Sequence, residues 1–505
     1  MQPMISTIST FDSLVVLAYL AAAVVVGLSV GRGNHTLDDY LLGGRNIPWW
    51  ALLASIVAAE TSSATFLSVP GLSFAKSGDF RFLQLAIGYI VGRTLVVVLF
   101  LPAYFRGSLF TAYELLERRF GRSTRRIASA LFLVARNIGD ALRLYLTAIV
   151  LSKAMGMSLT SCIVITGVVT AVYTLFGGMR SVVWNDCLQF VVYLVAAIAS
   201  AVILLQGIPG GFGQLWTYAE SHEKLRMFDF SWKLDDPYTF WAGLIGGTFL
   251  TLGTHGTDQM IVQRCLSARS QLEAGRTLIL SGVVVMVQFA LFLAIGVALA
   301  CYFDLHPPAE LIKKSDEAFA SFIVNNLPQG LLGLTLAGVV AASLSSSLNS
   351  SAATVVEDFG SLLRINDLAP AKRLRISKFV TLIFGVVQIV IAIIAAEMGL
   401  TNSVVDNVLA IAGFTFGILL GVFCLGLLPF RISSAAASTG MLAGIGVLIA
   451  VKFGPQYDWA LFKATVAWPW FPVIGSITTF TVGALVTPLF PRQDGSVENP
   501  AVSPF

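Results

Sequence analysis

Long apolar runs without charge constrain the fold of this chain more than any other feature of its sequence. The first run, residues 13–31, holds no charged side chain over 19 residues, about the length that an α-helix needs to cross a membrane. Similar runs follow, and charged residues make up 12% of the chain, against about 25% in soluble proteins. Such runs exceed the roughly ten alternating residues of a barrel strand. The sequence therefore predicts an all-α integral membrane protein, with residues 1–505 forming a single transmembrane domain.

About 13 transmembrane helices are predicted from these runs. A lead helix is expected near residues 13–32, and two extra helices near 434–453 and 468–490 complete the set. The ten core helices are expected near residues 48–73, 82–105, 126–152, 159–177, 186–206, 239–263, 276–302, 328–358, 376–397 and 403–427. The tail, residues 491–505, is polar and contains proline, so we expect it to be disordered.

Basic residues in the loops predict the orientation of these helices. With the N-terminus outside, the inside loops hold 19 Lys and Arg residues and the outside segments hold 10. The largest inside cluster consists of Arg106, Arg118, Arg119, Arg122, Arg125 and Arg126. Because the cytoplasmic side carries the excess of basic residues, we expect the N-terminus outside and the C-terminus inside. The expected location is the plasma membrane, as a multi-pass protein of a bacterial inner membrane.

Polar residues interrupt two of the predicted core helices. In the helix near 48–73, Glu60 stands beside a run of hydroxyl residues. In the helix near 239–263, residues 253–259 combine glycine, hydroxyl groups and charge, which weaken a helix; alternatively, the helix ends there in a polar loop. These are the first helices of two successive sets of five. Interrupted helices at matching positions indicate the binding site of a transporter, so we expect a secondary transporter for a small organic solute.

Glu60 is the most informative single residue of the sequence. A carboxylate near the bilayer centre costs several kcal/mol unless it is paired, so such residues are functional by default. The residues leave several roles open for Glu60: pairing with Arg143, accepting hydrogen bonds from a solute, binding a cation or carrying a proton. A purely structural pair is a further alternative.

The core helix near 126–152 holds three charged residues on one face, Arg136, Asp140 and Arg143. They either neutralise one another as a structural group, or Arg143 faces a cavity and binds an anion. Asp186 lies at the expected start of the fifth core helix, where the helix dipole stabilises an acid.

The core helix near 328–358 is rich in serine. Ser343, Ser346, Ser347 and Ser350 follow the spacing of one helix face. Their hydroxyl groups suit a hard cation, which prefers oxygen ligands. The alternative is close helix packing through small residues.

Other classes of function lack support in the sequence. The chain has 4 His residues, no phosphate-binding glycine loop and no nucleophile paired with a base, so neither an ATP-driven pump nor an enzyme is expected. The net charge of +4 is too small to indicate a nucleic-acid partner. The expected partners are the lipid bilayer and the solute, without an obligatory protein partner.

Five segments carry a resemblance to a known family: residues 62–71, 111–121, 177–189, 258–264 and 345–358. Over roughly residues 10–490 the chain resembles the sodium/solute symporter family, which includes sodium/glucose, proline, monocarboxylate and sialic acid transporters. The resemblance implies inverted five-helix repeats with broken first helices. The first repeat would span about 48–206 and the second about 239–427.

The resemblance also implies that one or two sodium ions bind. The first ion would contact the carbonyls of Ala58, Thr61 and Val339 and the hydroxyl of Ser343. The family usually has a second hydroxyl residue just before that serine, where this chain has Ala342. A second ion, as in sialic acid transporters, would use the residues that match here, namely Asp186, Ser345 and Ser346.

The solute pocket of sialic acid transporters is similar at Ser62, Thr65, Phe80 and Gln84. Glu60 replaces a hydroxyl residue there, and the carboxylate-binding arginine of that subgroup falls near Gly139 or Asp140. The implied pocket, with Glu60 and Arg143 added, therefore fits a neutral polyhydroxy or amine-bearing solute as well as sialic acid.

The favoured interpretation is a sodium-coupled symporter that imports a solute by alternating access. The alternatives are a proton-coupled symporter that uses Glu60, and a solute sensor or ion-leak protein without concentrative transport.

Overall fold

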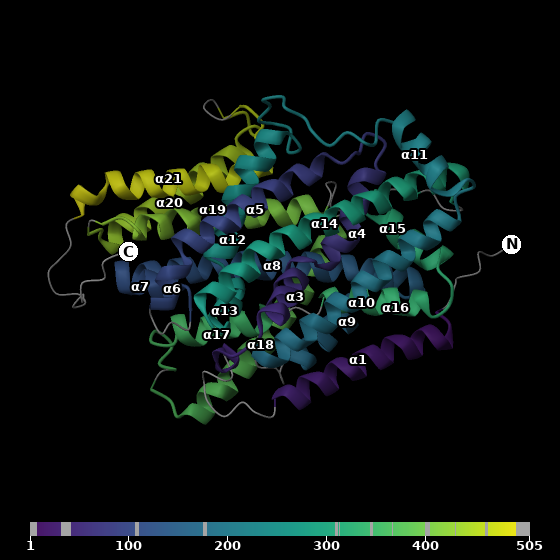
Figure 1. The fold of residues 1–505 in the computed structure, drawn as a ribbon. Helices are drawn as coiled ribbons and strands as arrows, with labels where there is room; N and C mark the ends of the chain where they lie inside the picture. The colour runs from purple at the N-terminus through teal and green to yellow at the C-terminus, as the bar shows by residue number, and fades with distance from the viewer. Residues whose placement is uncertain are drawn as a thin grey trace.

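The computed structural model of the protein describes residues 8–31, 42–106, 111–174, 179–308, 312, 314–343, 347–365, 367–398, 404–429, 431–459 and 463–490. Throughout these ranges the regular structure is helical, as the sequence predicts, apart from an isolated parallel bridge between Ile47 and Ala268 (Figure 1). The predicted tail, residues 491–505, lies outside the described part of the chain.

A helix, or a pair of helices, occupies each of the expected transmembrane segments. The first set comprises α1 (Thr10–Gly31), α3 (Trp49–Glu60), α4 (Ser63–Phe74), α5 (Gln84–Leu99), α6 (Leu101–Arg106), α8 (Arg122–Met155), α9 (Leu159–Thr174) and α10 (Met179–Gln206). The second comprises the π-helix η3 (Ala242–Gly246), α12 (Gly247–Gly256), α13 (Gln259–Leu266), α14 (Gln271–Leu305), α16 (Leu331–Ser343), α17 (Ser347–Asp358), α18 (Pro370–Met398) and α19 (Val404–Gly426). The chain continues through α20 (Ser434–Phe453) and α21 (Phe471–Leu485).

Shorter helices connect these segments or lie at their ends. They are η1 (Gly43–Arg45), η2 (Arg81–Leu83), α7 (Tyr113–Phe120), α11 (Gly211–Ser221), α15 (Glu317–Asn326), η4 (Trp468–Trp470) and η5 (Thr487–Leu489). Of the described helices, 6 are long and apolar enough to cross a membrane by themselves, or up to 8 if two bent pairs are counted as spans. The other expected spans are shorter or divided, so length alone does not identify them.

Both expected interruptions are present. The axes on either side of the first break, between α3 and α4, differ by 58°. In the second, α12 ends at Gly256 and α13 begins after Asp258, whose side chain accepts a hydrogen bond from the Met260 backbone N–H at 2.9 Å. Because α13 is buried almost throughout, the alternative of a helix that ends in a polar loop is wrong.

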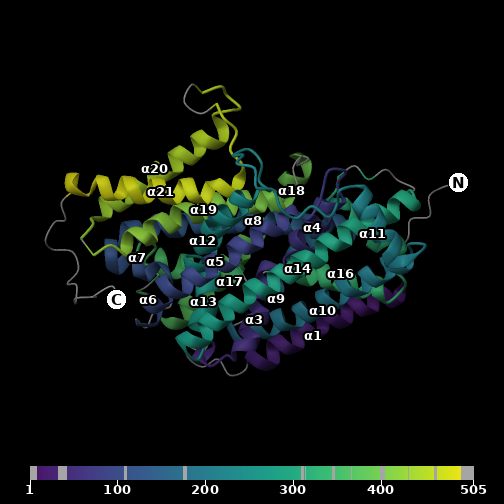
Figure 2. The ribbon, with the colours of Figure 1, turned by 45° about the horizontal axis from the view of Figure 1, so that its top comes forward.

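The helices form a thick bundle, with the lead helix at one edge and the last two helices at the opposite edge. Helix α1 lies along one edge against α10 and α16, and α20 and α21 lie at the opposite edge against α19 (Figures 1 and 2). Between them, α5 packs against α12 and α14. A Cβ atom at Gly88 of α5 would lie 2.3 Å from the carbonyl oxygen of Gly243, in η3 directly before α12. The backbones of α5 and η3 are therefore in direct contact through small residues.

One expected boundary is wrong in a way that affects a candidate residue. Helix α10 begins at Met179, whereas the expected segment began at residue 186. Asp186 therefore lies two turns inside the helix, where the dipole effect of the first turn has faded. Its charge must be balanced by side chains.

Candidate functional site

The break between α3 and α4 turns backbone carbonyl groups away from helical pairing. The Thr61 backbone N–H donates to the Val57 carbonyl at 2.8 Å, but the next N–H, of Ser62, donates to the Glu60 carbonyl at 2.9 Å. The Ala58 carbonyl therefore loses the N–H that a continuous helix would supply. Backbone carbonyl oxygens of this kind suit a hard cation such as sodium.

The remaining predicted ligands of the first ion lie on the segment that follows α15. Helix α16 packs against α4, and Val339 on α16 is buried. The side chains of Ala342 and Ser343 lie outside the described part of the structure, as do residues Ser345 and Ser346 entirely. The oxygen ligands within the described part of the chain are the carbonyls of Ala58 and Thr61, beside α16. Their chemistry fits a sodium site.

Glu60 ends α3 and binds two partners across the core. Its Oε2 lies 2.5 Å from Arg93 Nη2 on α5, and its Oε1 lies 2.7 Å from His255 Nε2 on α12. Arg93, which is fully buried, also donates to the Ser281 hydroxyl on α14. The interpretation that Glu60 pairs with Arg143 is therefore wrong, because Arg93 supplies the counter-charge.

The three charged residues of α8 do gather, as the structural interpretation expected. Asp140 lies between Arg136 at 3.4 Å and Arg143 at 3.3 Å. Asp258, at the start of α13, lies 3.7 Å from Arg136, and Ser347 of α17 donates to Asp140. Two arginines thus face two aspartates, and the group joins α8 to the second half of the broken sixth core helix.

Asp186 belongs to a third buried group. Arg264 of α13 donates to Asp186 Oδ2 at 2.8 Å, and the Ser55 hydroxyl of α3 donates to the same oxygen at 2.5 Å. Arg264 is 2% exposed at its side chain and Asp186 is 8% exposed. The charge of Asp186 is therefore already balanced here, and a second sodium ion at this acid would compete with Arg264.

The residues predicted to hold a solute fall into two places. Ser62 and Thr65 are buried at the break, where the Thr65 hydroxyl donates to the Glu60 carbonyl at 3.2 Å. The neighbouring Ser63 hydroxyl donates to the Arg143 carbonyl at 2.8 Å, which brings α4 against α8. Arg143 and Glu60 thus both adjoin the start of α4.

Gln84 and Phe80 lie further along, where α5 begins. The amide nitrogen of Gln84 donates to the Tyr238 carbonyl at 2.9 Å, and its oxygen accepts from the Asp229 N–H at 3.1 Å. The Phe80 N–H donates to the Arg226 carbonyl at 3.0 Å. Both residues therefore also fix the long connection between α11 and η3.

A cavity of about 410 Å³ opens next to this connection. It lies among the end of α4, the short helix η2 before α5, and the starts of α15 and α19. Its lining includes the charged residues Asp79, Arg81, Lys314, Asp316 and Asp406 and the aromatic residues Phe82 and Tyr238. Nearby, the Ser231 backbone N–H, with Arg226 and Arg81, holds the pKa of Asp229 below its usual value.

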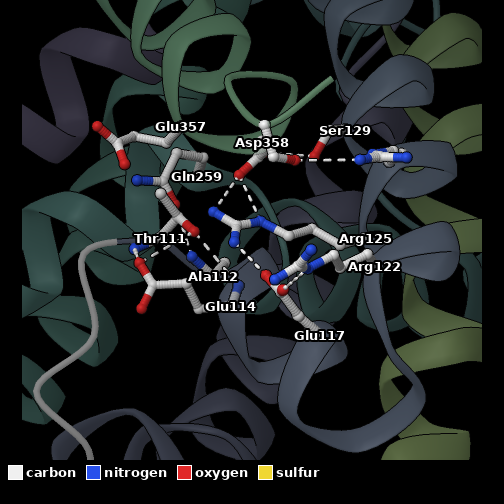
Figure 3. Close-up of polar contacts among 12 residues, drawn as sticks. Thr111, Ala112, Glu114, Glu117, Arg122, Arg125, Ser129, Gln259, Glu357 and Asp358 are labelled. Atoms are coloured by element: carbon white, nitrogen blue, oxygen red, sulfur yellow. Dashed lines mark hydrogen bonds and ion pairs between the residues drawn. The ribbon is translucent and has the colours of Figure 1, made fainter. Parts of the chain in front are cut away.

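An ion-pair network closes the opposite end of the molecule (Figure 3). Arg125 of α8 pairs with Asp358 at the end of α17 at 2.5 Å and with Glu117 of α7. Ser129 also donates to Asp358, whose side chain is fully buried. Gln259 of α13 accepts a hydrogen bond from the Ala112 N–H at 2.7 Å. The network therefore joins α7, α8 and α17, and α13 is held beside it.

Three nitrogen-bearing side chains that contact Glu60 or Asp186 were not among the sequence candidates: Arg93, His255 and Arg264. Arg93 had a usable signal, since an arginine within an apolar run needs a partner. His255 stood inside the expected break of the sixth core helix, beside Asp258. Arg264 follows the same segment, and spacing alone gave it no partner.

The chain is similar to known proteins over most of its length. The model of the sodium:solute symporter family matches residues 40–444. The human sodium/iodide cotransporter is 31% identical over 481 residues, which cover 91% of this chain and 71% of that protein. The sodium/sialic acid symporter SiaT of Proteus mirabilis is 28% identical, with 97% of each chain covered. Sodium-coupled monocarboxylate transporter 1 of Xenopus laevis is 30% identical, covering 97% of this chain and 80% of that one.

Two solved structures share the fold of this chain. The substrate-bound outward-open state of a Na⁺-coupled sialic acid symporter has a TM-score of 0.83 and 28% identity, with 96% of this chain and 98% of that chain covered. The nucleobase-cation-symport-1 family transporter Mhp1, in a closed conformation, has a TM-score of 0.57 at 15% identity, which shows a shared fold alone. The chain therefore belongs to the sodium:solute symporter family, and the ion that it binds is sodium.

Proposed function

We propose that this chain is a sodium-coupled symporter that imports a small organic solute by alternating access. The observation that carries the proposal is the meeting of the two broken helices, where Glu60 at the end of α3 contacts His255 near the end of α12 at 2.7 Å. Broken helices that meet in the core leave backbone groups for ions and solutes where a membrane protein otherwise pairs them.

The proposed architecture places these helices first in two inverted repeats, residues 48–206 and 239–427. The lead helix, α20 and α21 would stand outside the repeats. The N-terminus would face outward and the C-terminus inward, in the plasma membrane. The excess of basic residues in the inside loops supports this orientation.

The proposed sodium site uses the carbonyls of Ala58, Thr61 and Val339 and the hydroxyl of Ser343, beside Ala342. A membrane potential of 100 mV supplies about 2.3 kcal/mol for each sodium ion that enters. A second ion at Asp186, Ser345 and Ser346 would double this driving force. It requires Arg264 to leave Asp186, so the second site would form only when α13 moves relative to α10.

The residues proposed to line the solute are Glu60, Ser62, Thr65, Phe80, Gln84 and Arg143. Ser62 and Thr65 would contact hydroxyl groups of the solute. The similar proteins are named for sialic acid, monocarboxylates and iodide. The hydroxyl residues favour a solute with hydroxyl groups, and the named solutes share a single negative charge, so we propose a hydroxyl compound with at most one negative charge.

The contacts at the two ends of the molecule support an inward-closed state of the proposed transport cycle. The buried pairs of Asp186 with Arg264 and of Asp358 with Arg125 hold the inner end together. The cavity beside Tyr238 opens at the other end. Together they agree with an inward-closed state, which would receive solute from outside.

Uptake into proteoliposomes tests the proposal. Uptake should require sodium and fail when potassium or choline replaces it at constant pH, and solute should accumulate against its gradient. Full uptake without sodium, driven instead by a pH gradient, would favour proton coupling through Glu60. Binding without accumulation would favour a sensor or leak. A thermal-shift screen of sugars, sialic acids, monocarboxylates and amines, with and without sodium, would identify the solute.

A further inference from the structure

The cluster around Glu60 has one side chain on each of four helices. Glu60 belongs to α3, Arg93 to α5, His255 to α12 and Ser281 to α14. Helix α5 packs against α12 and α14, and α14 also packs against α3. Helices α5, α12 and α14 lie near the middle of the bundle in both views, and α3 lies below them, towards α1 (Figures 1 and 2). The cluster thus ties the break of α3 to the break of α12 within one packed unit.

The position of Glu60 is unfavourable without its partners. As the last residue of α3 it stands at the negative end of the helix dipole, which disfavours a carboxylate. Arg93 is fully buried, and a buried guanidinium needs a counter-charge. Each group therefore supplies the charge that the other lacks, and the loss of either leaves an unpaired charge in the core.

His255 completes the coordination of the carboxylate. Its Nε2 faces Glu60 Oε1, and its Nδ1 lies 3.0 Å from the Thr254 hydroxyl. With both ring nitrogens engaged, a neutral imidazole donates to Glu60 and accepts from Thr254. Glu60 and Arg93 then balance each other, and each carboxylate oxygen of Glu60 has a donor.

The surrounding backbone fixes the path of Arg93. A Cβ atom at Gly92 of α5 would lie 2.6 Å from the Thr248 carbonyl oxygen of α12. A Cβ atom at Gly282 of α14 would lie 3.2 Å from Arg93 Cδ. Glycine therefore provides both the close approach of α5 to α12 and the space for the arginine stem.

We propose that Glu60, Arg93, His255 and Ser281 form a buried clamp that holds the two helix breaks together. Arg93, His255 and Ser281 act as positioning residues, without contact to ion or solute. They orient the backbone carbonyls that we propose to bind sodium. Ala58 lies two residues before Glu60 and Thr61 directly after it, so a fixed Glu60 side chain fixes the direction of both carbonyls. This inference rests on the proposed sodium coupling and deepens it.

The clamp has a consequence for the class of solute. Because the charge of Glu60 is balanced by Arg93, a bound solute does not meet an unpaired carboxylate there. An amine-bearing solute gains no ion pair at Glu60, whereas a solute without a positive charge loses nothing. The clamp therefore narrows the proposed solutes to neutral or singly anionic hydroxyl compounds.

A double-mutant cycle on the purified full chain tests the clamp. The variants are Glu60→Gln, Arg93→Gln and the double variant, with Glu357→Gln as control, since Glu357 pairs with Arg373 at 2.9 Å in a partly exposed setting. Each single clamp variant should lower the melting temperature by more than about 5 °C. Each should also weaken sodium affinity, read from sodium-dependent thermal shifts, by about tenfold or more. The double variant should recover more than half of both losses, and Glu357→Gln should resemble wild type.

Other results overturn the clamp. If Glu60→Gln keeps its melting temperature and sodium affinity but loses solute affinity, Glu60 is a direct ligand of the solute. A double variant no better than the sum of the single variants shows that the two residues do not act together. If sodium fails to stabilise even the wild type, sodium coupling itself fails, and the melting temperatures of the cycle alone still decide on the clamp.

Ser281→Ala covers the case in which the charge variants do not fold. It removes one hydroxyl that Arg93 donates to and leaves both charges in place. Sodium affinity should fall by about two- to fivefold, because the lost hydrogen bond is to charged Arg93, which affects the sodium site only through Glu60. Solute affinity at saturating sodium should stay unchanged. An unaltered sodium affinity in this variant would contradict the clamp.

Discussion

The two ends of the molecule, which we propose to be its inner and outer ends, are held by ion pairs that differ in burial. At the inner end, Asp358 is fully buried beside Arg125, and Arg264 is 2% exposed beside Asp186. At the outer end, Arg81 is 18% exposed and faces three partly exposed acids: Asp79 and Asp229, at 11% and 10%, and Asp236, at 27%. Removing one partner of a buried pair is costly, whereas exposed pairs contribute little. In the proposed orientation and transport cycle, this difference predicts that the inner end resists opening more than the outer end does.

The largest expected effect comes from breaking the inner network. Asp358→Asn should lower the free energy of unfolding by about 3–5 kcal/mol, because Arg125 loses its buried partner. The control is Glu117→Gln, which removes the other partner of Arg125, a more exposed acid, and should cost under about 1 kcal/mol. Thermal or denaturant unfolding in detergent measures both. Equal losses for the two variants would show that burial does not distinguish the two contacts.

Asp186 tests whether the second inner pair also serves an ion. If a second sodium ion binds there, Asp186→Asn should lower the Hill coefficient for sodium from about two towards one, since one charged ligand is gone. Ser55→Ala is the matched control, because it removes a hydrogen bond to the same oxygen and keeps the charge. A lower melting temperature with an unchanged Hill coefficient would leave Asp186 as a structural partner of Arg264.

The sequence predicted the helices and their breaks better than the partners within the site. Apolar runs and the polar interruptions at Glu60 and at residues 253–259 report local backbone properties, and both breaks are present. Partner choice depends on how distant helices pack, and Glu60 meets Arg93, 33 residues away, rather than Arg143. Spacing within one helix did identify the group of Arg136, Asp140 and Arg143, because those residues share a face.

The start of α10 shows a related limit. Polar residues before Asp186 ended the apolar run, although the helix continues through them. Hydropathy marks where a helix leaves the hydrocarbon region, not where its backbone hydrogen bonds end. The mistaken boundary gave Asp186 a helix dipole as its partner, when the structure supplies Arg264.

A buried contact near the outer end sharpens the comparison between the ends. Asp12 of the lead helix accepts hydrogen bonds from the backbone N–H groups of Gly330 and Gly333, at 2.7 and 2.8 Å, where α16 begins. Asp12→Ala should cost about 1–2 kcal/mol, as for the loss of a helix N-cap. Sodium affinity measured by thermal shift should fall with it if α1 holds α16 in place. Unchanged stability would show that α1 only lies against the bundle.

The smallest effect is expected at the outer ion pairs. Arg81→Gln should change stability by about 1 kcal/mol or less, and the difference should shrink further in high salt, because these charges are partly open to solvent and are screened. The pKa of Asp229 lies below its ordinary value of 3.8, so its contribution is present above that pH and is lost as the pH falls through the lowered value. The difference in melting temperature between wild type and Arg81→Gln should therefore stay constant from neutral pH to about pH 5. It should shrink only in stronger acid. Convergence already near neutral pH would contradict the lowered pKa of Asp229 as the source of this pH dependence.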